Sequence, residues 1–157
     1  MPDPRYDVTI VDYAPRHQAA FAALNYAWIE QYFSIEAADR ESLDHPQEKI
    51  LQPGGAILMA ELHSEAVGTC ALIRISDSEL ELAKMAVSEA HRGARIGLLL
   101  GQAAIERARH LGASQLWLES NTILTPALSL YRKLGFQAEP QQPSDYARSN
   151  IQMRLQL

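Results

Sequence analysis

The chain has 157 residues, of which 47% are hydrophobic, and it carries a formal net charge of −5 without any run of Lys or Arg. Its length and apolar content predict one domain, residues 1–157, with a buried core, and its charge argues against nucleic acid as a partner. We see no signal-peptide pattern in the sequence and no apolar stretch long enough to span a membrane, which favours a cytoplasmic protein without a membrane partner.

The first half of the chain predicts a strand, a helix and an antiparallel meander. Residues 8–11 form a short apolar run. Pro15 opens a predicted helix with one apolar stripe, formed by Ala20, Phe21, Leu24, Ala27 and Trp28. Residues 30–53 are expected to form a short helical or irregular lip. Two β-prone runs follow at 56–62 and 66–75, separated by a polar turn.

The second half alternates strands and helices. Glu79 to Val87 is predicted to be a strand, and apolar residues from Ile96 to Leu111 recur at helical spacing. Gln115 to Glu119 gives the next strand. A short helix then begins at Thr125-Pro126 and ends at Gly135, because proline suits the first turn of a helix and glycine its C-terminal cap. The last predicted strands are 136–138 and 150–157.

The cysteine and histidine content argues against a disulfide and against a metal site. Cys70 is the only cysteine and lies in an apolar β-prone run, which is typical of a small buried residue. The five histidines show neither H-x-x-x-H spacing nor Cys/His clustering. We therefore expect surface histidines and no bound metal.

The segment between the fourth strand and the long helix has the features of an anion-binding turn. It contains Arg92, Gly93, Ala94, Arg95, Ile96 and Gly97. Unpaired N–H groups at a helix start point into such a turn, and the helix dipole favours negative charge there. Gly93 and Gly97 would let the main chain approach a phosphate, and the two arginines would add charge-assisted contacts. An ordinary strand-to-helix loop with solvated arginines fits the same spacing.

A dinucleotide-binding oxidoreductase is a rival interpretation of this unit. The order is strand, glycine turn, helix and strand, and Glu119 follows Gly97 at about the interval expected of an acidic ribose ligand. However, Gly93, Gly97 and Gly101 are four residues apart, unlike G-x-G-x-x-G, and no second mononucleotide-binding half follows. This reading therefore ranks lower.

Residues 79–136 resemble the central motif of the GNAT superfamily of N-acetyltransferases, which transfer acetyl from acetyl-coenzyme A to an amine. The matching segments are Glu81–Val87 as a splayed central strand, Arg92–Gly97 as the pyrophosphate turn, and Leu128–Phe136 after the next strand. The resemblance implies an α/β (α+β) fold: a central, mostly antiparallel twisted sheet of about seven strands, splayed near the middle, with helices on both faces. It also implies acetyl-coenzyme A as the cosubstrate, and a homodimer is common for such folds.

Two positions depart from the family pattern. The turn usually reads Arg-x-x-Gly-x-Gly, and Arg95 stands in place of the first of these glycines. Leu124 stands where many relatives carry an asparagine, and Asn121 is a nearby candidate for that contact. By resemblance, the main chain at Met85, Ala86 and Val87 would pair with the pantetheine arm, and a backbone N–H there would stabilise the oxyanion.

The acetyl acceptor requires a base if it resembles a lysine side chain, since at pH 7 only on the order of one such amine in a thousand is neutral. Glu81 is the candidate, on a strand whose odd positions share one face with Ala83 and Met85. By position alone, Glu79 is an equal claimant and either could be a solvated carboxylate; the resemblance favours Glu81. For a less basic α-amine, Glu81 would only steer the cation.

Tyr131 is the candidate general acid for the departing thiolate. A phenol with a pKa of about 10 can protonate a thiolate with a pKa of about 8.5 when it is well positioned. Helical periodicity alone favours a core aromatic here, whereas the match over Leu128–Phe136 favours the acid. Lys84 is expected to be a surface charge, with a phosphate contact as the alternative.

The acceptor side is less well defined. Its candidate residues are Trp28, Tyr32, Phe33, Tyr146 and Arg148. The Arg148 guanidinium could bind a substrate carboxylate, which would suit a small-molecule or amino-acid-like amine. Alternatively Trp28 and Phe33 pack in the core and Arg148 is solvated. A non-catalytic acyl-coenzyme A binding or sensing module remains the alternative to an acyltransferase.

Overall fold

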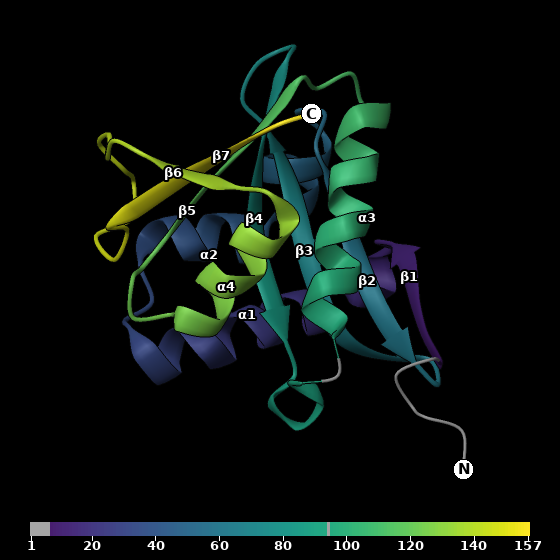
Figure 1. The fold of residues 1–157 in the computed structure, drawn as a ribbon. Coiled ribbons are helices and arrows are strands. Elements are labelled where there is room, and N and C mark those ends of the chain that lie inside the picture. Colours follow the sequence, from purple (N-terminus) through teal and green to yellow (C-terminus); the bar gives the residue numbers. More distant parts are fainter. Residues whose placement is uncertain (1–6, 94) are drawn as a thin grey trace.

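The computed structural model describes residues 7–93 and 95–157, so the predicted turn residue Ala94 lies outside the described residues. Its strands form one seven-stranded sheet in the order β1-β2-β3-β4-β5-β7-β6 (Figure 1). The strands are β1 (Val8–Asp12), β2 (Ala56–Leu62), β3 (Glu65–Arg74), β4 (Glu79–Val87), β5 (Gln115–Ser120), β6 (Gln137–Glu139) and β7 (Ile151–Gln156). All neighbours are antiparallel except β4 and β5. The predicted mostly antiparallel sheet is confirmed.

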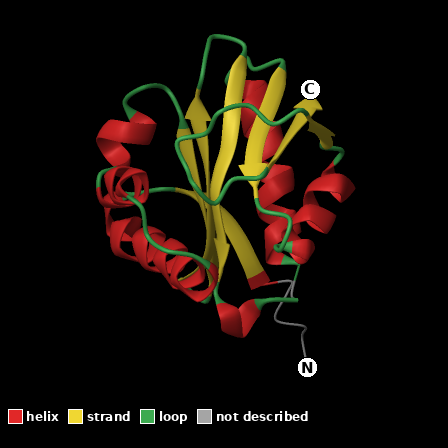
Figure 2. Cartoon of the chain, turned by 90° about the vertical axis from the view of Figure 1, so that its left-hand side faces the viewer, coloured by secondary structure: helices red, strands yellow, loops and turns green. Residues whose placement is uncertain are grey.

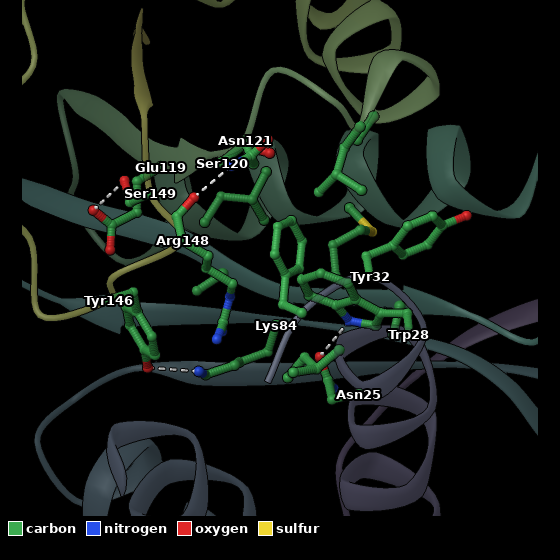
Figure 3. Close-up of a pocket in the computed structure, with 18 of the residues that line it drawn as sticks. Asn25, Trp28, Tyr32, Lys84, Glu119, Ser120, Asn121, Tyr146, Arg148 and Ser149 are labelled. Carbon is green, nitrogen blue, oxygen red and sulfur yellow. Dashed lines mark hydrogen bonds between the residues drawn. The ribbon is translucent and has the colours of Figure 1, made fainter. Parts of the chain in front are cut away.

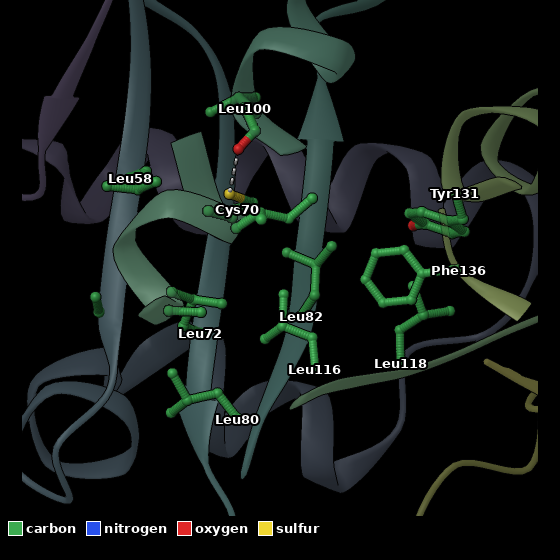
Figure 4. Packing of buried hydrophobic residues seen from close by; sticks show 14 of the residues in the cluster. Leu58, Cys70, Leu72, Leu80, Leu82, Leu100, Leu116, Leu118, Tyr131 and Phe136 are labelled. Carbon is green, nitrogen blue, oxygen red and sulfur yellow. Dashed lines mark hydrogen bonds between the residues drawn. The ribbon is translucent and has the colours of Figure 1, made fainter. Parts of the chain in front are cut away.

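Helices cover both faces of the sheet, as Figure 2 shows. They are α1 (Gln18–Tyr32), α2 (Ala37–Asp44), α3 (Ile96–His110) and α4 (Thr125–Leu134), with short helical turns at Pro15–His17, Gln47–Leu51 and Glu89–His91. One buried cluster packs α3 and α4 against the sheet and includes Leu80, Leu100 and Leu116 (Figure 4). A second cluster on the other face includes Phe21 and Ile57. The fold is therefore a three-layer α/β arrangement.

The buried stripe of α1 differs from the predicted one. The helix buries Phe21, Asn25 and Ile29, spaced four residues apart, whereas Ala27 of the expected apolar stripe is exposed. Asn25 is tolerated in the core because its amide donates to the Phe21 carbonyl oxygen at 3.0 Å. Its carbonyl oxygen accepts from the Trp28 indole N–H at 3.4 Å. The polar residue thus orients Trp28.

The sheet opens between β4 and β5. These strands pair only where Glu79–Glu81 lie beside Gln115–Trp117. Beyond this point β4 continues to Val87 along β3, and β5 continues to Ser120 along β7. The expected splay near the middle of the sheet is therefore confirmed, and Glu81 is the last residue of β4 that pairs with β5.

A bulge in β4 lies inside this opening. The β3–β4 register shifts between Thr69 and Ala71, and Lys84 has a left-handed backbone with φ of 55°. After the bulge, Met85 and Val87 pack against the same cluster as Leu80 and Leu82. The prediction that all odd positions share one face is therefore wrong, because the extra residue shifts the alternation of side chains.

Candidate active site

A cavity of about 510 Å³ occupies the opening between β4 and β5. Its walls come from the end of α1, from β4, from the β5–α4 connection, from α4 and from the loop between β6 and β7 (Figure 3). The structure brings together many of the predicted site residues on this surface: Trp28, Tyr32, Phe33, Glu81, Met85, Ala86, Val87, Arg92, Asn121, Tyr131, Tyr146 and Arg148. Gly93, Arg95, Ile96 and Gly97 are not among its lining residues.

The turn before α3 has the backbone geometry of a glycine-rich loop. Gly93 has φ of 85°, and Arg95 has φ of 63° immediately before the helix begins. A left-handed backbone conformation costs a residue with a Cβ about 1–2 kcal/mol. The position therefore suits a glycine, and Arg95 is strained there. Arg92, three residues earlier, lines the cavity.

Gly97 has a packing role that its sequence context did not indicate. A Cβ built on Gly97 would lie 3.2 Å from Leu130, and one on Gly101 would lie 2.5 Å from Leu134. Both glycines therefore let α4 approach α3 closely. Ile96 is 1% exposed within the same core. Gly97 therefore has a packing role in addition to the predicted approach of its main chain to an anion, which stays a prediction.

The two candidate carboxylates differ in environment. Glu79 forms an ion pair with Arg154. Glu81 lines the cavity at the end of the β4–β5 pairing. Burial, together with the negative charges of Glu119 and Asp145, raises the pKa of Glu81 from its ordinary value of 4.5 to about 7, although Lys84 opposes this rise. Glu81 therefore has the acidity expected of a base that works near neutral pH.

Tyr131 forms part of the cavity wall on α4. Its side chain is largely buried and meets the Phe136 ring edge-on, with 6.1 Å between ring centroids (Figure 4). Burial raises the pKa of Tyr131 to about 12, with a further contribution from Cys70. The phenol is therefore protonated at any physiological pH.

Lys84 is not the surface charge that the sequence suggested. The β4 bulge turns its side chain inward, where it is 6% exposed. Its ammonium donates to the Tyr146 hydroxyl at 2.8 Å and lies 3.8 Å from the Asp39 carboxylate. Burial lowers the pKa of Lys84, and the neighbouring Asp39 opposes that change. An alternating strand pattern could not reveal this, because the alternation fails at the bulge itself.

Arg148 lines the cavity, but its guanidinium already binds carboxylates of the protein. It donates to both oxygens of Asp39, at 2.6 and 2.9 Å, and to Glu36 at 3.2 Å. It also lies over the rings of Tyr146 and Trp28, at 4.6 and 5.7 Å from their centroids. The alternative of a solvated Arg148 is therefore wrong.

Asp39 is a central site residue that the sequence did not single out. Its carboxylate is fully buried and also accepts from the Glu36 backbone N–H at 2.9 Å, which caps α2. Burial alone would raise the pKa of Asp39, but the hydrogen bonds from Arg148 outweigh this and hold it below its ordinary value. A capping pattern marks the start of α2 in the sequence, but it gives no sign of an arginine more than a hundred residues away.

Asn121 connects two loops at the cavity rim. Its amide N–H donates to the Arg148 carbonyl oxygen at 2.8 Å, and its own oxygen accepts from the Ile123 backbone N–H at 2.9 Å. Figure 3 shows this contact above Arg148. The residue therefore joins the β5–α4 connection to the loop between β6 and β7.

Two residues outside the cavity, Cys70 and His17, are both buried. Cys70 is buried, as expected, and burial raises the pKa of its thiol to about 12. His17 is 2% exposed, so the expectation of surface histidines is wrong for this residue. It accepts from the Ala14 backbone N–H at 2.9 Å, and its other ring nitrogen lies 2.9 Å from Glu61.

Within residues 7–93 and 95–157, no three His, Cys, Asp or Glu side chains are arranged to hold a metal ion. In that same described part of the chain, no helix has both the length and the apolar character needed to cross a membrane.

The sequence model of the acetyltransferase (GNAT) family matches residues 21–136, which is most of the chain. The chain belongs to this family. It is 34% identical over 99 residues to the uncharacterized N-acetyltransferase YjgM of Escherichia coli K12, covering 61% of this chain and 59% of the relative. It is 38% identical over 60 residues to streptothricin acetyltransferase of Streptomyces lavendulae, covering 38% and 32%. The chain thus spans less than two thirds of these curated relatives.

Solved structures share the fold over nearly the whole chain. A GNAT acetyltransferase from Staphylococcus aureus superposes with a TM-score of 0.86 at 20% identity, covering 95% of this chain and 98% of that one. The PaiA N-acetyltransferase of Thermoplasma acidophilum, solved in complex with coenzyme A, gives a TM-score of 0.79 at 18% identity, covering 96% and 99%. At these identities the likeness shows the fold alone.

Proposed function

We propose that the chain, acting as one domain, transfers an acetyl group from acetyl-coenzyme A to a primary amine of a small molecule. Support comes from family membership, from the coenzyme A-bound PaiA relative and from the fold. The observation that carries the proposal is one cavity lined by Glu81, at the end of the β4–β5 pairing, and by both Arg92 and Arg148. A transferase needs such a continuous path because both substrates must meet at one point.

The cofactor would lie along the open edge of β4. Ala86 and Val87 pair with β3 on one side, and Met85–Val87 have no strand partner towards β5, so their backbone groups on that side are available to the pantetheine amides. The diphosphate would lie at the turn Arg92–Gly97, against the N-terminus of the fifteen-residue helix α3. Asn121 would face the same arm from the β5–α4 connection.

Glu81 would act as the base. The amine nitrogen attacks the thioester carbonyl carbon, a C–N bond forms, and the ammonium proton passes to the Glu81 carboxylate, directly or through a water molecule. A carboxyl group with a pKa of about 7 is substantially ionised at neutral pH, and it is a stronger base than an ordinary glutamate. The position of Glu81 in the cavity wall beside the opening supports this role, because the two substrates would meet there.

Tyr131 would assist the leaving group. The C–S bond breaks and the electron pair goes to sulfur, which needs a proton or a hydrogen-bond donor. Because the pKa of Tyr131 is about 12 and that of a thiol is about 8.5, full proton transfer is uphill. The phenol would therefore donate a hydrogen bond to the developing thiolate and keep its proton, and coenzyme A would leave as the thiolate and take a proton from solvent.

Thiol release from acetyl-coenzyme A, measured against a panel of amines, tests this proposal. We expect release that depends on both the amine and the enzyme. Calorimetry with coenzyme A gives the control, and Arg92→Ala should weaken its binding through loss of a phosphate contact. Binding without release on any amine would favour an acyl-coenzyme A sensing module, and absence of binding would contradict the proposal.

A further inference from the structure

The acceptor end of the cavity contains an excess of carboxyl groups. Five of them lie in its wall or next to it, and in the described part of the chain the cations in contact with them are Lys84 and Arg148; Arg92 also lines the cavity. Three of the carboxyl groups line the cavity directly, and the other two lie behind Arg148. The five are Glu36, Asp39, Glu81, Glu119 and Asp145.

Both cations are already compensated by the protein. Arg148 binds Asp39 through two hydrogen bonds of 2.6 and 2.9 Å and Glu36 through one of 3.2 Å. Lys84 lies 3.8 Å from Asp39 and donates to Tyr146. Two buried cations held by two carboxylates leave little positive charge for a substrate carboxylate. An amino-acid-like acceptor is therefore disfavoured by this surface.

The remaining carboxyl groups line the cavity without an ion pair in the described part of the chain, although the Lys84 charge acts on Glu81 and Glu119 from a distance. Glu119 accepts a hydrogen bond from the Ser149 hydroxyl at 3.1 Å, and this partner is neutral. Among the residues that the structure describes, neither Glu119 nor Asp145 takes part in an ion pair. Glu81, also unpaired in this way, is largely buried and faces the same space. A cavity with this charge attracts a positively charged group.

The aromatic side chains divide into two sets. The Trp28 and Tyr146 rings each lie within 6 Å of the Arg148 guanidinium, so each already makes a cation–π contact within the protein. Tyr32 and Phe33 line the cavity without such a partner in the described chain, and Tyr32 is 45% exposed. Figure 3 shows Glu119 and Ser149 at the opposite side of the cavity from Trp28 and Tyr32. The cavity therefore offers apolar contacts on one side and negative charge on the other.

We propose that the acceptor is a small aliphatic dication, a diamine or polyamine. One amine meets Glu81 and reacts. The second ammonium lies near the carboxylates of Glu119 and Asp145, which line the same cavity as Glu81. This inference rests on the proposed acetyl transfer and adds the class of acceptor to it.

A matched set of acceptors tests the charge preference. Cadaverine, pentylamine and 5-aminovalerate share a five-carbon chain and a primary amine, and they differ in the distal group, which is cationic, neutral or anionic. We expect kcat/KM for cadaverine to exceed that for pentylamine by about tenfold or more, beyond the twofold due to its two amines, with 5-aminovalerate lowest. Equal values for cadaverine and pentylamine, or a preference for 5-aminovalerate, would overturn the inference.

A variant assigns the preference to the carboxylate. Glu119→Gln should lower the cadaverine-to-pentylamine ratio by about tenfold, whereas Glu106→Gln, which removes an exposed charge on α3, should leave that ratio unchanged. The ratio is taken within one variant, so a general loss of folding or turnover cancels. An unchanged ratio in Glu119→Gln overturns the assignment. Absence of thiol release with every acceptor would instead contradict acetyl transfer itself, and the acceptor class with it.

Discussion

The two ends of the cavity are built in different ways. The proposed cofactor end uses a continuous stretch of chain, from Met85 to Gly97, and relies on backbone groups of a splayed strand and a helix start. The acceptor end uses side chains, and its main contact joins Arg148 to Asp39 across 109 positions of sequence. The proposed cofactor end therefore depends mainly on the backbone, whereas the proposed acceptor end depends on the identity of its side chains.

The largest expected effect lies where the two ends meet. Glu81→Gln should lower kcat/KM for a strongly basic amine by about 10²–10⁴-fold, because it removes the proposed base. In the wild-type protein, kcat/KM should rise with pH around a midpoint near 7, as Glu81 ionises. Steady-state kinetics between pH 5 and 9 measure both. A rate that persists in Glu81→Gln would remove Glu81 from the chemistry.

The same substitution should have the opposite effect on stability. The folded protein holds the Glu81 proton up to about pH 7, whereas the unfolded chain loses it near 4.5, so the contribution of this group to stability falls as pH rises through that window. Glu81→Gln should therefore raise the free energy of unfolding at pH 8 by about 1–3 kcal/mol and leave it almost unchanged at pH 4. Urea unfolding at the two pH values measures this difference.

At the acceptor end, Asp39→Ala should destabilise the protein by about 3–5 kcal/mol, because it leaves Arg148 and Lys84 buried without their carboxylate. Asp44→Ala is the matched control. It removes an exposed carboxylate of the same helix that bonds Tyr26, so its cost should stay within about 1 kcal/mol. Equal melting temperatures for the two variants would mean that the buried ion pair between Asp39 and Arg148 does not stabilise the protein.

At the cofactor end, Tyr131→Phe should lower kcat by roughly 10²-fold while acetyl-coenzyme A affinity stays nearly constant, since only the hydroxyl is lost. Tyr26→Phe serves as the control, because it removes a phenol hydroxyl that bonds Asp44 and Tyr26 is not among the residues that line the cavity. Single-turnover kinetics and calorimetry separate the two quantities. A weakened affinity with full turnover would assign Tyr131 to binding alone.

A smaller effect concerns the packing of α3 on α4, which supports the cofactor end. Gly101→Ala should cost about 1–3 kcal/mol, because the new methyl group would lie 2.5 Å from Leu134. Gln102→Ala, one residue further on and exposed, should change stability by less than about 0.5 kcal/mol. Similar denaturation midpoints for these variants would show that α4 moves aside at little cost.

The smallest expected effect tests the unusual turn residue. Arg95→Gly should change stability by at most about 1 kcal/mol, because relief of the left-handed strain is offset by the greater entropy of glycine in the unfolded chain. If Arg95 contacts phosphate, coenzyme A affinity should fall while stability does not. Calorimetry on the variant measures that affinity, and an unchanged value would leave Arg95 without a role in binding.

The sequence predicted the fold well because its signals are local. Strand alternation, helical spacing and the caps at Pro126 and Gly135 lie within a few residues of one another, and the motif over residues 79–136 is continuous. Glu81 and Tyr131 were found in this way. Their catalytic roles remain predictions.

The acceptor end could not be predicted to the same depth. The bulge at Lys84 reverses the alternation that the strand pattern assumes, and so a buried ammonium looked like a surface charge. The partners of Arg148 come from α2, which a single sequence does not connect to the loop between β6 and β7. The burial of Asn25 was also not predicted. Its polar amide is tolerated in the core because it donates to a carbonyl oxygen of its own helix.

The central claim is that one cavity, opened by the divergence of β4 and β5, holds both substrates with Glu81 between them. A crystal structure of the protein with coenzyme A tests it most directly. We expect the diphosphate at the turn between β4 and α3, the pantetheine arm beside Met85–Val87, and the sulfur within about 3–4 Å of the Tyr131 hydroxyl. Coenzyme A bound outside this opening, or with its sulfur directed away from Glu81 and Tyr131, would contradict the claim.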